Sequence, residues 1–107
     1  MVARYKAQMI ARTWRGWTAA ADADAYVDYL NETGLKEYRE TPGNRGAWLL
    51  RRMDGDRAEF VTLTFWDDMD AVRRFAGEDP DRAVYYPEDE RFLVEREDTV
   101  SHYDLIE

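Results

Sequence analysis

The pattern of apolar and polar residues is clearest between Phe60 and Gly77, where a period of two gives way to a period of about 3.6. Residues 60–66 are rich in β-branched and aromatic side chains and predict a strand. In the helix that follows, Asp67 or Asp68 is suited to cap the first turn, and Gly77 is suited to end the last. The apolar face of this helix comprises Met69, Val72, Phe75 and Ala76.

The N-terminal part of the chain predicts another strand and another helix. Residues 6–17 alternate loosely, which is typical of a strand that is partly covered on both faces. Thr18 is a candidate N-cap for a helix that reaches about Thr33. Gly34 interrupts this helix, and one further turn leads to the turn residues 41–44.

A hairpin is predicted in the middle of the chain. Residues 45–53 predict a second strand, which a turn at residues 54–56 joins to the strand before the amphipathic helix. A two-residue turn places Leu50 opposite Glu59, whereas a three-residue loop places Arg51 opposite Glu59. Cross-strand pairs of opposite charge are favourable, and we therefore prefer the three-residue loop.

The C-terminal third predicts a short helix and a last strand. Asp79 and Pro80 suit the N-cap and first position of a helix that ends at Tyr86. We interpret residues 87–91 as a solvated connector and residues 92–105 as a fourth strand with polar interruptions. The resulting order, βαββαβ, predicts an α+β fold of the ferredoxin-like, split βαβ type, with helices over one face of an antiparallel sheet.

The predicted sheet is apolar on both of its faces. The side chains that make it so include Trp48, Leu49, Leu50, Val61, Leu63 and Phe65. A sheet face without helices is usually polar, and an apolar one needs a second cover, which a second copy of so short a chain can provide. We therefore expect a homodimer.

Composition narrows the functional classes. We expect residues 1–107 to form a single domain. The net charge of −8 argues against a nucleic-acid partner. The absence of cysteine excludes disulfides and thiolate sites and favours the reducing cytoplasm. No segment approaches the ~20 apolar residues of a membrane span, and residues 1–6 lead into no apolar signal-peptide core.

Five segments together resemble antibiotic biosynthesis monooxygenase-like domains. They are Met9–Trp14, Tyr38–Asn44, Glu59–Trp66, Phe75–Gly77 and Ala83–Asp89. The resemblance covers nearly the whole chain and implies ferredoxin-like protomers whose sheets join in a dimeric α+β barrel, with a pocket between each sheet and its own helices. Such proteins include oxygenases that act on electron-rich aromatic rings without a cofactor, heme-degrading proteins, and members without known catalysis. Fold alone does not choose among these activities.

The heme-degrading branch of that family resembles this chain less closely. Its Asn on the first strand, Trp on the second helix and His ligand beyond that Trp correspond here to Thr13, Phe75 and Tyr85. A tyrosine binds heme iron only as a phenolate, and spaced His or Cys ligands for other metals are absent. We therefore expect no cofactor and no metal site, and Phe75 becomes a candidate contact for a substrate ring.

Five further residues are candidates for chemistry. His102, the only histidine, could transfer a proton or be a half-exposed structural residue. Arg12 and Trp14 share one face of the first strand, where a cation beside an aromatic wall could hold an anionic enolate or phenolate. Arg12 could equally pair with an acid. One hydroxyl of Tyr85 and Tyr86 could orient a phenolic substrate, or both rings could simply pack at a helix end.

Two functional hypotheses follow from these residues and the resemblance. The first is a small monooxygenase that needs no cofactor and admits an electron-rich aromatic or quinone-type molecule between its sheet and helices. The second is a small-molecule-binding module without catalysis, and heme binding or degradation is a third. In the first hypothesis the catalytic residues are Arg12, Tyr85 and His102, and the substrate-binding residues are Trp14, Phe75 and Tyr86.

Overall fold

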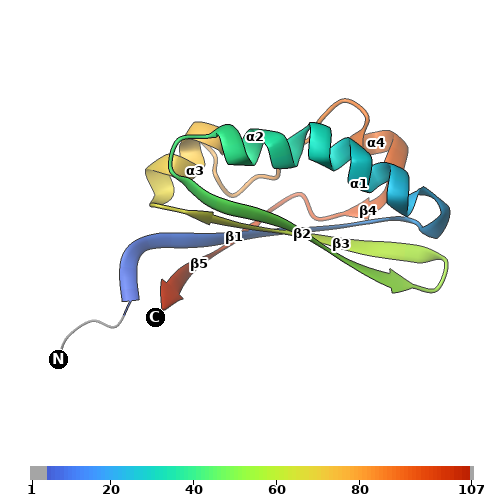
Figure 1. Ribbon diagram of the computed structural model, residues 1–107, viewed down its shortest axis with the longest axis horizontal. Coiled ribbons are helices and arrows are strands. Elements are labelled where there is room, and N and C mark those ends of the chain that lie inside the picture. Colours follow the sequence, from blue (N-terminus) through green and yellow to red (C-terminus); the bar gives the residue numbers. More distant parts are fainter. Residues whose placement is uncertain (1–4, 107) are drawn as a thin grey trace.

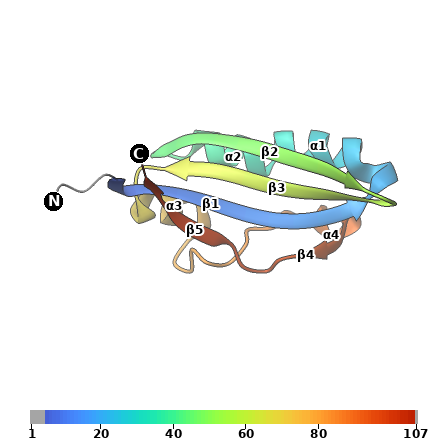
Figure 2. The same cartoon turned by 90° about the horizontal axis from the view of Figure 1, so that it is seen from below.

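One antiparallel sheet carries the fold in the computed structural model, which describes residues 5–106 (Figure 1). Its strands run in the order β2-β3-β1-β4, and β5 also pairs with β1 (Figure 2). The strands are β1 (Tyr5–Ala19), β2 (Asn44–Asp54), β3 (Arg57–Trp66), β4 (Leu93–Arg96) and β5 (Ser101–Ile106).

All the helices lie on the same side of this sheet (Figure 1). They are the 3₁₀ turn η1 (Ala20–Asp22), α1 (Ala23–Glu32), α2 (Gly34–Glu40), α3 (Met69–Ala76) and α4 (Asp89–Phe92). The predicted α+β class, with helices over one face of an antiparallel sheet, is confirmed. The expectation about a signal peptide rests partly on residues 1–4, which lie outside the described residues. Within residues 5–106, no helix is long and apolar enough to cross a membrane.

The strand and helix at the middle of the chain form as predicted. The Asp68 carboxylate caps α3 by accepting a hydrogen bond from the Ala71 N–H at 2.8 Å. Gly77 ends the helix with φ of +85°, a conformation that side-chain-bearing residues rarely adopt. Trp66 at the end of β3 is fully buried, as expected of a core residue.

Two predictions for the first helix and the hairpin were wrong. Thr18 is not an N-cap, because β1 continues through it and its hydroxyl donates to the Ala19 carbonyl at 2.9 Å. The hairpin adopts neither predicted register, since Arg52 lies opposite Glu59. Its loop consists of Gly55 and Asp56, and Gly55 supplies a φ of +61°. This register still joins opposite charges, with a salt bridge of 2.5 Å between Arg52 and Glu59.

The predicted helix over residues 79–86 is absent, and the single predicted last strand is divided in two. Both differences have one cause, since residues 81–83 and 98–100 pair with each other. The Ala83 N–H donates to the Asp98 carbonyl at 2.9 Å, and the Val100 N–H donates to the Asp81 carbonyl at 2.8 Å. Backbone groups that form these hydrogen bonds cannot also form the hydrogen bonds of a helix or pair with the edge of β1.

The connector at residues 87–91 contains a helix that sequence analysis did not predict. Asp89 begins α4 and is only 2% exposed, although it stands in an acidic run that we interpreted as solvated. Consecutive acidic residues are usually exposed to solvent, but an acidic side chain with hydrogen-bond partners in the protein interior can be buried. Asp89 has two such partners, which are described with the site below.

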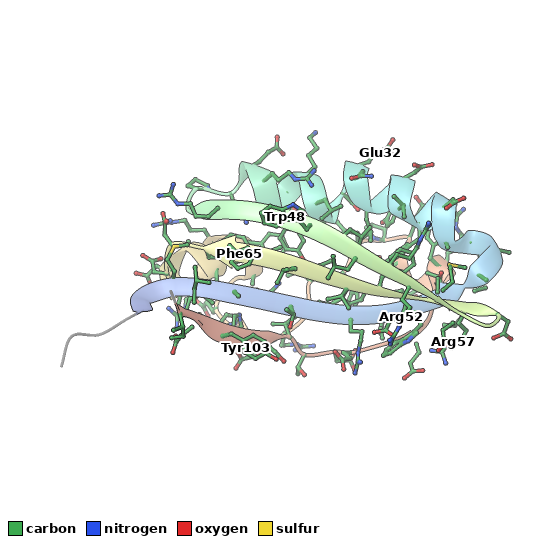
Figure 3. The ribbon with its side chains drawn as sticks, turned by 60° about the horizontal axis from the view of Figure 1, so that its bottom comes forward. Glu32, Trp48, Arg52, Arg57, Phe65 and Tyr103 are labelled. Carbon is green, nitrogen blue, oxygen red and sulfur yellow. The ribbon has the colours of Figure 1, made fainter. Side chains whose placement is uncertain are left out.

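The hydrophobic core lies between the sheet and the helices, and its largest fully buried members include Tyr26, Leu35, Phe60, Trp66 and Val72. The opposite face of the sheet carries no helix, yet it is rich in apolar side chains (Figure 3). There Trp48 on β2 is 51% exposed and Tyr103 on β5 57%, with Phe65 on β3, one of the two strands between them. The two-sided apolar character predicted from the sequence is therefore present in the folded chain.

Candidate functional site

A cavity lies between the helix-facing side of the sheet, helices α1 and α2, and the extended segment 83–86. The cavity is narrow, with about 20 Å³ of free space, enough for about one water molecule. Its wall includes five aromatic rings and one guanidinium. The polar and aromatic residues of the wall are Arg12, Trp14, Tyr26, Tyr38, Thr62, Tyr85, Tyr86 and Asp89.

Arg12 is the cationic part of this wall. It leaves β1 on the helix-facing side and is only 2% exposed. Its Nη2 donates to the carbonyls of Pro80 at 3.4 Å and Arg82 at 3.2 Å, while its buried Nε has no hydrogen-bond partner within residues 5–106. Burial lowers the pKa of the Arg12 guanidinium, and Tyr38 and Asp81 partly oppose this shift.

No carboxylate among the described residues lies within salt-bridge distance of Arg12. The guanidinium stands over the ring of Phe75, with 5.5 Å between Cζ and the ring centroid. Backbone carbonyls and a ring face orient a cation without cancelling its charge. Within residues 5–106 Arg12 therefore forms no salt bridge with an acid, although the same cavity wall also carries the carboxyl group of Asp89.

Trp14 and Tyr85 form one side of the cavity as a connected pair. The Trp14 indole N–H donates to both the Tyr85 hydroxyl oxygen and the Glu97 carbonyl, each at 3.0 Å. The Tyr85 hydroxyl donates to the same carbonyl at 2.5 Å. Burial raises the pKa of Tyr85, so its hydroxyl stays protonated at neutral pH. Because its hydroxyl hydrogen is engaged with Glu97, Tyr85 can offer a ligand its ring and the oxygen lone pair that Trp14 does not occupy.

Tyr86, the next residue in segment 83–86, is held by two hydrogen bonds. Its hydroxyl donates to Glu37 of α2 at 2.6 Å, and its backbone N–H donates to Asp89 at 2.6 Å. Asp89 also accepts a hydrogen bond of 3.0 Å from the Tyr26 hydroxyl of α1. Burial raises the pKa of Asp89 and also that of Tyr26. The carboxylate of Asp89 thus connects segment 83–86 of the cavity wall, through Tyr86, to helix α1, through Tyr26.

His102 and Phe75 lie beside the cavity and do not line it. His102 stands on β5 directly opposite Arg12, so both side chains leave the same face of the sheet. The Nδ1 atom of His102 is 3.2 Å from the Asp81 carboxylate, and the buried Nε2 atom of the same ring has no hydrogen-bond partner in the described part of the chain. Burial lowers the pKa of His102, as does the positive charge of Arg12. Phe75 packs against Tyr38, with 4.5 Å between the ring centroids.

The structure thus brings four of the six predicted site residues to the cavity wall and the other two to Arg12. Sequence reasoning missed Tyr26, Tyr38, Asp81 and Asp89. Tyr26 and Tyr38 stand at helix positions whose apolar neighbours predicted burial, and that stripe was the available signal. Nothing local distinguishes Asp81 or Asp89 from the other acids around them, because their roles depend on partners far away in the chain.

A wider hollow of about 560 Å³ lies open to solvent between α1, α2 and the edge strand β2. Its arginines are already engaged. Arg51 pairs with Asp24 at 2.7 Å, and Arg39 donates to the Ala47 carbonyl at 2.9 Å. Among residues 5–106, no group of three or more His, Cys, Asp or Glu side chains is arranged to hold a metal ion. The cavity beside Arg12 is therefore the better candidate site.

Comparison with known proteins gives structural matches only. No protein-family model matches the sequence, and no curated protein matches it. A Bacillus cereus protein assigned as an antibiotic biosynthesis monooxygenase is 12% identical, with a TM-score of 0.65 over 92% of this chain and 93% of that chain. SnoaB from Streptomyces nogalater, a cofactor-independent oxygenase, is 18% identical, with a TM-score of 0.60 over 94% and 96%.

A third solved structure, the heme-degrading protein Rv3592 from Mycobacterium tuberculosis, is 16% identical and has a TM-score of 0.55 over 94% of both chains. Proteins of different activity therefore share this architecture, and likeness at this level of identity establishes the fold alone. The fold of this chain is that of the antibiotic biosynthesis monooxygenase-like proteins, a ferredoxin-like α+β fold built on an antiparallel sheet.

Proposed function

We propose that this protein is a small oxygenase that needs no cofactor and acts on an ionisable, electron-rich aromatic or quinone-type molecule. The carrying observation is Arg12, a buried cation in an aromatic cavity wall without an acidic partner among the described residues. A buried cation that forms no salt bridge favours an anionic ligand. The SnoaB likeness supports the same reading, because that protein of similar fold is a cofactor-independent oxygenase.

The reaction proposed needs only the substrate, dioxygen and a proton acceptor. With anthrone as the example, the enol form passes its hydroxyl proton to His102 and becomes an enolate, which Arg12 stabilises. The enolate passes one electron to dioxygen, and the resulting carbon radical and superoxide join through a new C–O bond. The peroxide anion takes back the first proton from His102. Loss of the remaining proton from the oxygen-bearing carbon, with cleavage of the O–O bond, then leaves a carbonyl, and the expelled hydroxide and that proton form water. The substrate supplies every electron that dioxygen accepts.

The site residues have distinct roles in this proposal. Arg12 holds the oxyanion, and His102, whose lowered pKa keeps it neutral at pH 7, accepts the proton. Trp14 and Tyr86 form the walls against the substrate ring, Tyr85 orients its polar edge, and Phe75 supports the guanidinium from below. Ligand pockets usually measure about 300–1,000 Å³, so the cavity must widen on binding. Segment 83–86 is half-buried and neither helix nor strand, and its movement would release the hydrogen bonds that Tyr85 and Tyr86 form with Glu97 and Glu37.

We further propose that the protein is a cytoplasmic homodimer in which a second copy covers the exposed apolar face of the sheet. Trp48, Leu50 and Tyr103 are each at least half exposed on this face. Contiguous apolar surface of this kind commonly marks an interface. A barrel formed by two such sheets would also stiffen β1, which carries Arg12.

Heme fits the site poorly. Tyr85, at the position that corresponds to the heme ligand, donates a hydrogen bond to the Glu97 carbonyl and has a raised pKa, whereas an iron ligand would be a phenolate. A spectroscopic titration of the purified protein with hemin is therefore expected to show no shift of the Soret band. A stoichiometric shift would favour the heme-binding function instead.

Oxygen uptake tests the proposal. The protein is dialysed against a chelator, and a panel of anthrones and hydroquinones is supplied in an oxygen electrode. At least one substrate should be consumed faster than in buffer, and Arg12→Met should lower kcat/KM about 100-fold, the usual effect of removing an oxyanion donor. Arg45→Gln is the matched control, because Arg45 is an exposed arginine that pairs with Asp67.

Two outcomes would contradict oxygenation. Uptake that stays at the buffer rate with every substrate would refute it. If the same compounds still quench the fluorescence of the protein's tryptophans in a saturable manner, the alternative of a binding module without catalysis would be the correct function.

A further inference from the structure

A short segment, Pro80–Arg82, contacts both Arg12 and His102. The carbonyls on either side of Asp81 accept hydrogen bonds from the Arg12 guanidinium, and the Asp81 carboxylate lies 3.2 Å from Nδ1 of His102. The segment is itself held by the hydrogen bond from the Val100 N–H to the Asp81 carbonyl. The backbone of the segment therefore positions the cation, while its one acidic side chain is directed to the imidazole.

The chemistry of this contact fixes where the imidazole carries its proton. An ionised carboxylate only accepts hydrogen bonds, so the ring nitrogen that faces Asp81 has to be the donor. A neutral imidazole with its proton on Nδ1 has a lone pair on Nε2. The Nε2 atom is buried and has no hydrogen-bond partner among the described residues, and the same is true of the Nε atom of Arg12.

These two unpaired atoms differ in kind and come from neighbouring positions. Arg12 and His102 are paired across β1 and β5, where Cβ atoms are about 5 Å apart. The guanidinium offers a donor, and Nε2 of the imidazole offers an acceptor. A hydroxyl group satisfies both, because its oxygen accepts from Arg12 while its hydrogen is donated to His102. Transfer of that hydrogen leaves an oxyanion beside the cation.

We infer that Asp81 is a positioning residue, which holds His102 as the Nδ1–H tautomer so that Nε2 takes the proton of an enolic or phenolic hydroxyl whose oxygen faces Arg12. The role of Nε2 as a base rests on the proposed function, whereas the tautomer does not. The charged groups that bear on the imidazole are Arg12 on β1 and Asp81 on the segment before α4.

The single histidine makes this inference directly measurable. A long-range ¹H–¹⁵N correlation spectrum of the labelled full-length protein shows one imidazole and reports which nitrogen carries the proton. We expect a protonated Nδ1 and an unprotonated Nε2 at neutral pH. Asp81→Asn should abolish the predominance of this tautomer, because the amide can donate to Nδ1. Asp104→Asn removes the same charge from an exposed position on the same strand and should leave the tautomer unchanged.

Kinetic measurements on Asp81→Asn distinguish a residue that positions His102 from one that only supports the fold. With a substrate that the protein oxidises, kcat should rise with pH as His102 loses its proton. Asp81→Asn should lower kcat about 10-fold with little change in KM, and it should move the midpoint of the pH profile to lower pH together with the NMR titration of His102. Wild-type protein with its proton on Nε2, or a tautomer that Asp81→Asn leaves unaltered, would overturn the inference. If no substrate is oxidised, the proposed function fails, while the spectrum still decides the tautomer.

Discussion

Replacement of Arg12 by methionine should make the protein more stable. Arg12 is 2% exposed and its charge has no acidic partner among the described residues, so the folded state bears much of the cost of removing a cation from water. That cost is several kcal/mol for a buried ion, and the unpaired Nε adds about 1–3 kcal/mol. Methionine keeps an unbranched apolar stem in the same space without the charge.

The interactions that Arg12→Met removes are weaker than these costs. Two long hydrogen bonds, at 3.2 and 3.4 Å, contribute about 1 kcal/mol each, and the carbonyl of the exposed Arg82 can bind water instead. The contact with the Phe75 ring at 5.5 Å contributes about 1 kcal/mol. The net expectation is a gain of about 1–3 kcal/mol in the free energy of unfolding, or at least about 4 °C in Tm per kcal/mol.

Urea unfolding measures this change as an increase in the midpoint concentration without a change in slope. Arg39→Met is the matched control, because Arg39 is an exposed arginine that donates to the Ala47 carbonyl at 2.9 Å. It should lower stability by about 0.5–1 kcal/mol. A loss of more than about 1 kcal/mol in Arg12→Met would refute the reasoning, since it would mean that Arg12 is retained as a structural support. A gain would be typical of a residue retained for function at a cost in stability.

Three further predictions concern the rest of the site and the sheet. Folding raises the pKa of Asp89, so the free energy of unfolding should fall as pH rises from 3.8 to the pKa of Asp89 in the folded protein, and then level off. Asp89→Asn should remove this pH dependence in urea unfolding. Asp89→Ala should lower the free energy of unfolding by about 1–3 kcal/mol, because it leaves the Tyr86 N–H unpaired. A retained slope in Asp89→Asn would assign the titration to another group. Trp48→Lys should convert a dimer into a monomer in sedimentation velocity, and a wild-type monomer at micromolar concentration would contradict the proposed interface. Tyr85→Phe should raise KM for phenolic substrates about fivefold with a smaller change in kcat, and an equal fall in kcat would instead assign its hydroxyl to the chemical step.

The fold was predictable from the sequence wherever local signals agreed with one another. The segment from Phe60 to Gly77 combines a period-two strand, an Asp cap and a glycine stop, and each signal is satisfied by neighbours a few residues away. The two apolar faces of the sheet were predictable for the same reason, because strand alternation is a local property. Arg12 and Trp14 could be assigned to one face from their spacing alone.

The errors occur where distant groups decide the structure. Pro80 suits the first turn of a helix, but residues 81–83 pair instead with residues 98–100, which lie far along the chain. The same pairing divides the predicted last strand. Asp89 was indistinguishable from its acidic neighbours because its partners, Tyr26 and the Tyr86 N–H, come together only in the folded protein. The contact of Asp81 with His102 depends in the same way on a long-range pairing.

Labelling with isotopically heavy dioxygen tests the central claim most directly, namely that a buried, unneutralised Arg12 holds an aromatic anion for direct reaction with oxygen. The chelator-treated protein is incubated with anthrone under heavy dioxygen, and the product is analysed by mass spectrometry with Arg12→Met in parallel. We predict one heavy oxygen atom per product molecule, in the newly formed carbonyl, at a rate well above that in buffer, and a rate close to that in buffer for the folded Arg12→Met protein. Product formation that is equally fast with both proteins, or no faster than in buffer with either, would contradict the account.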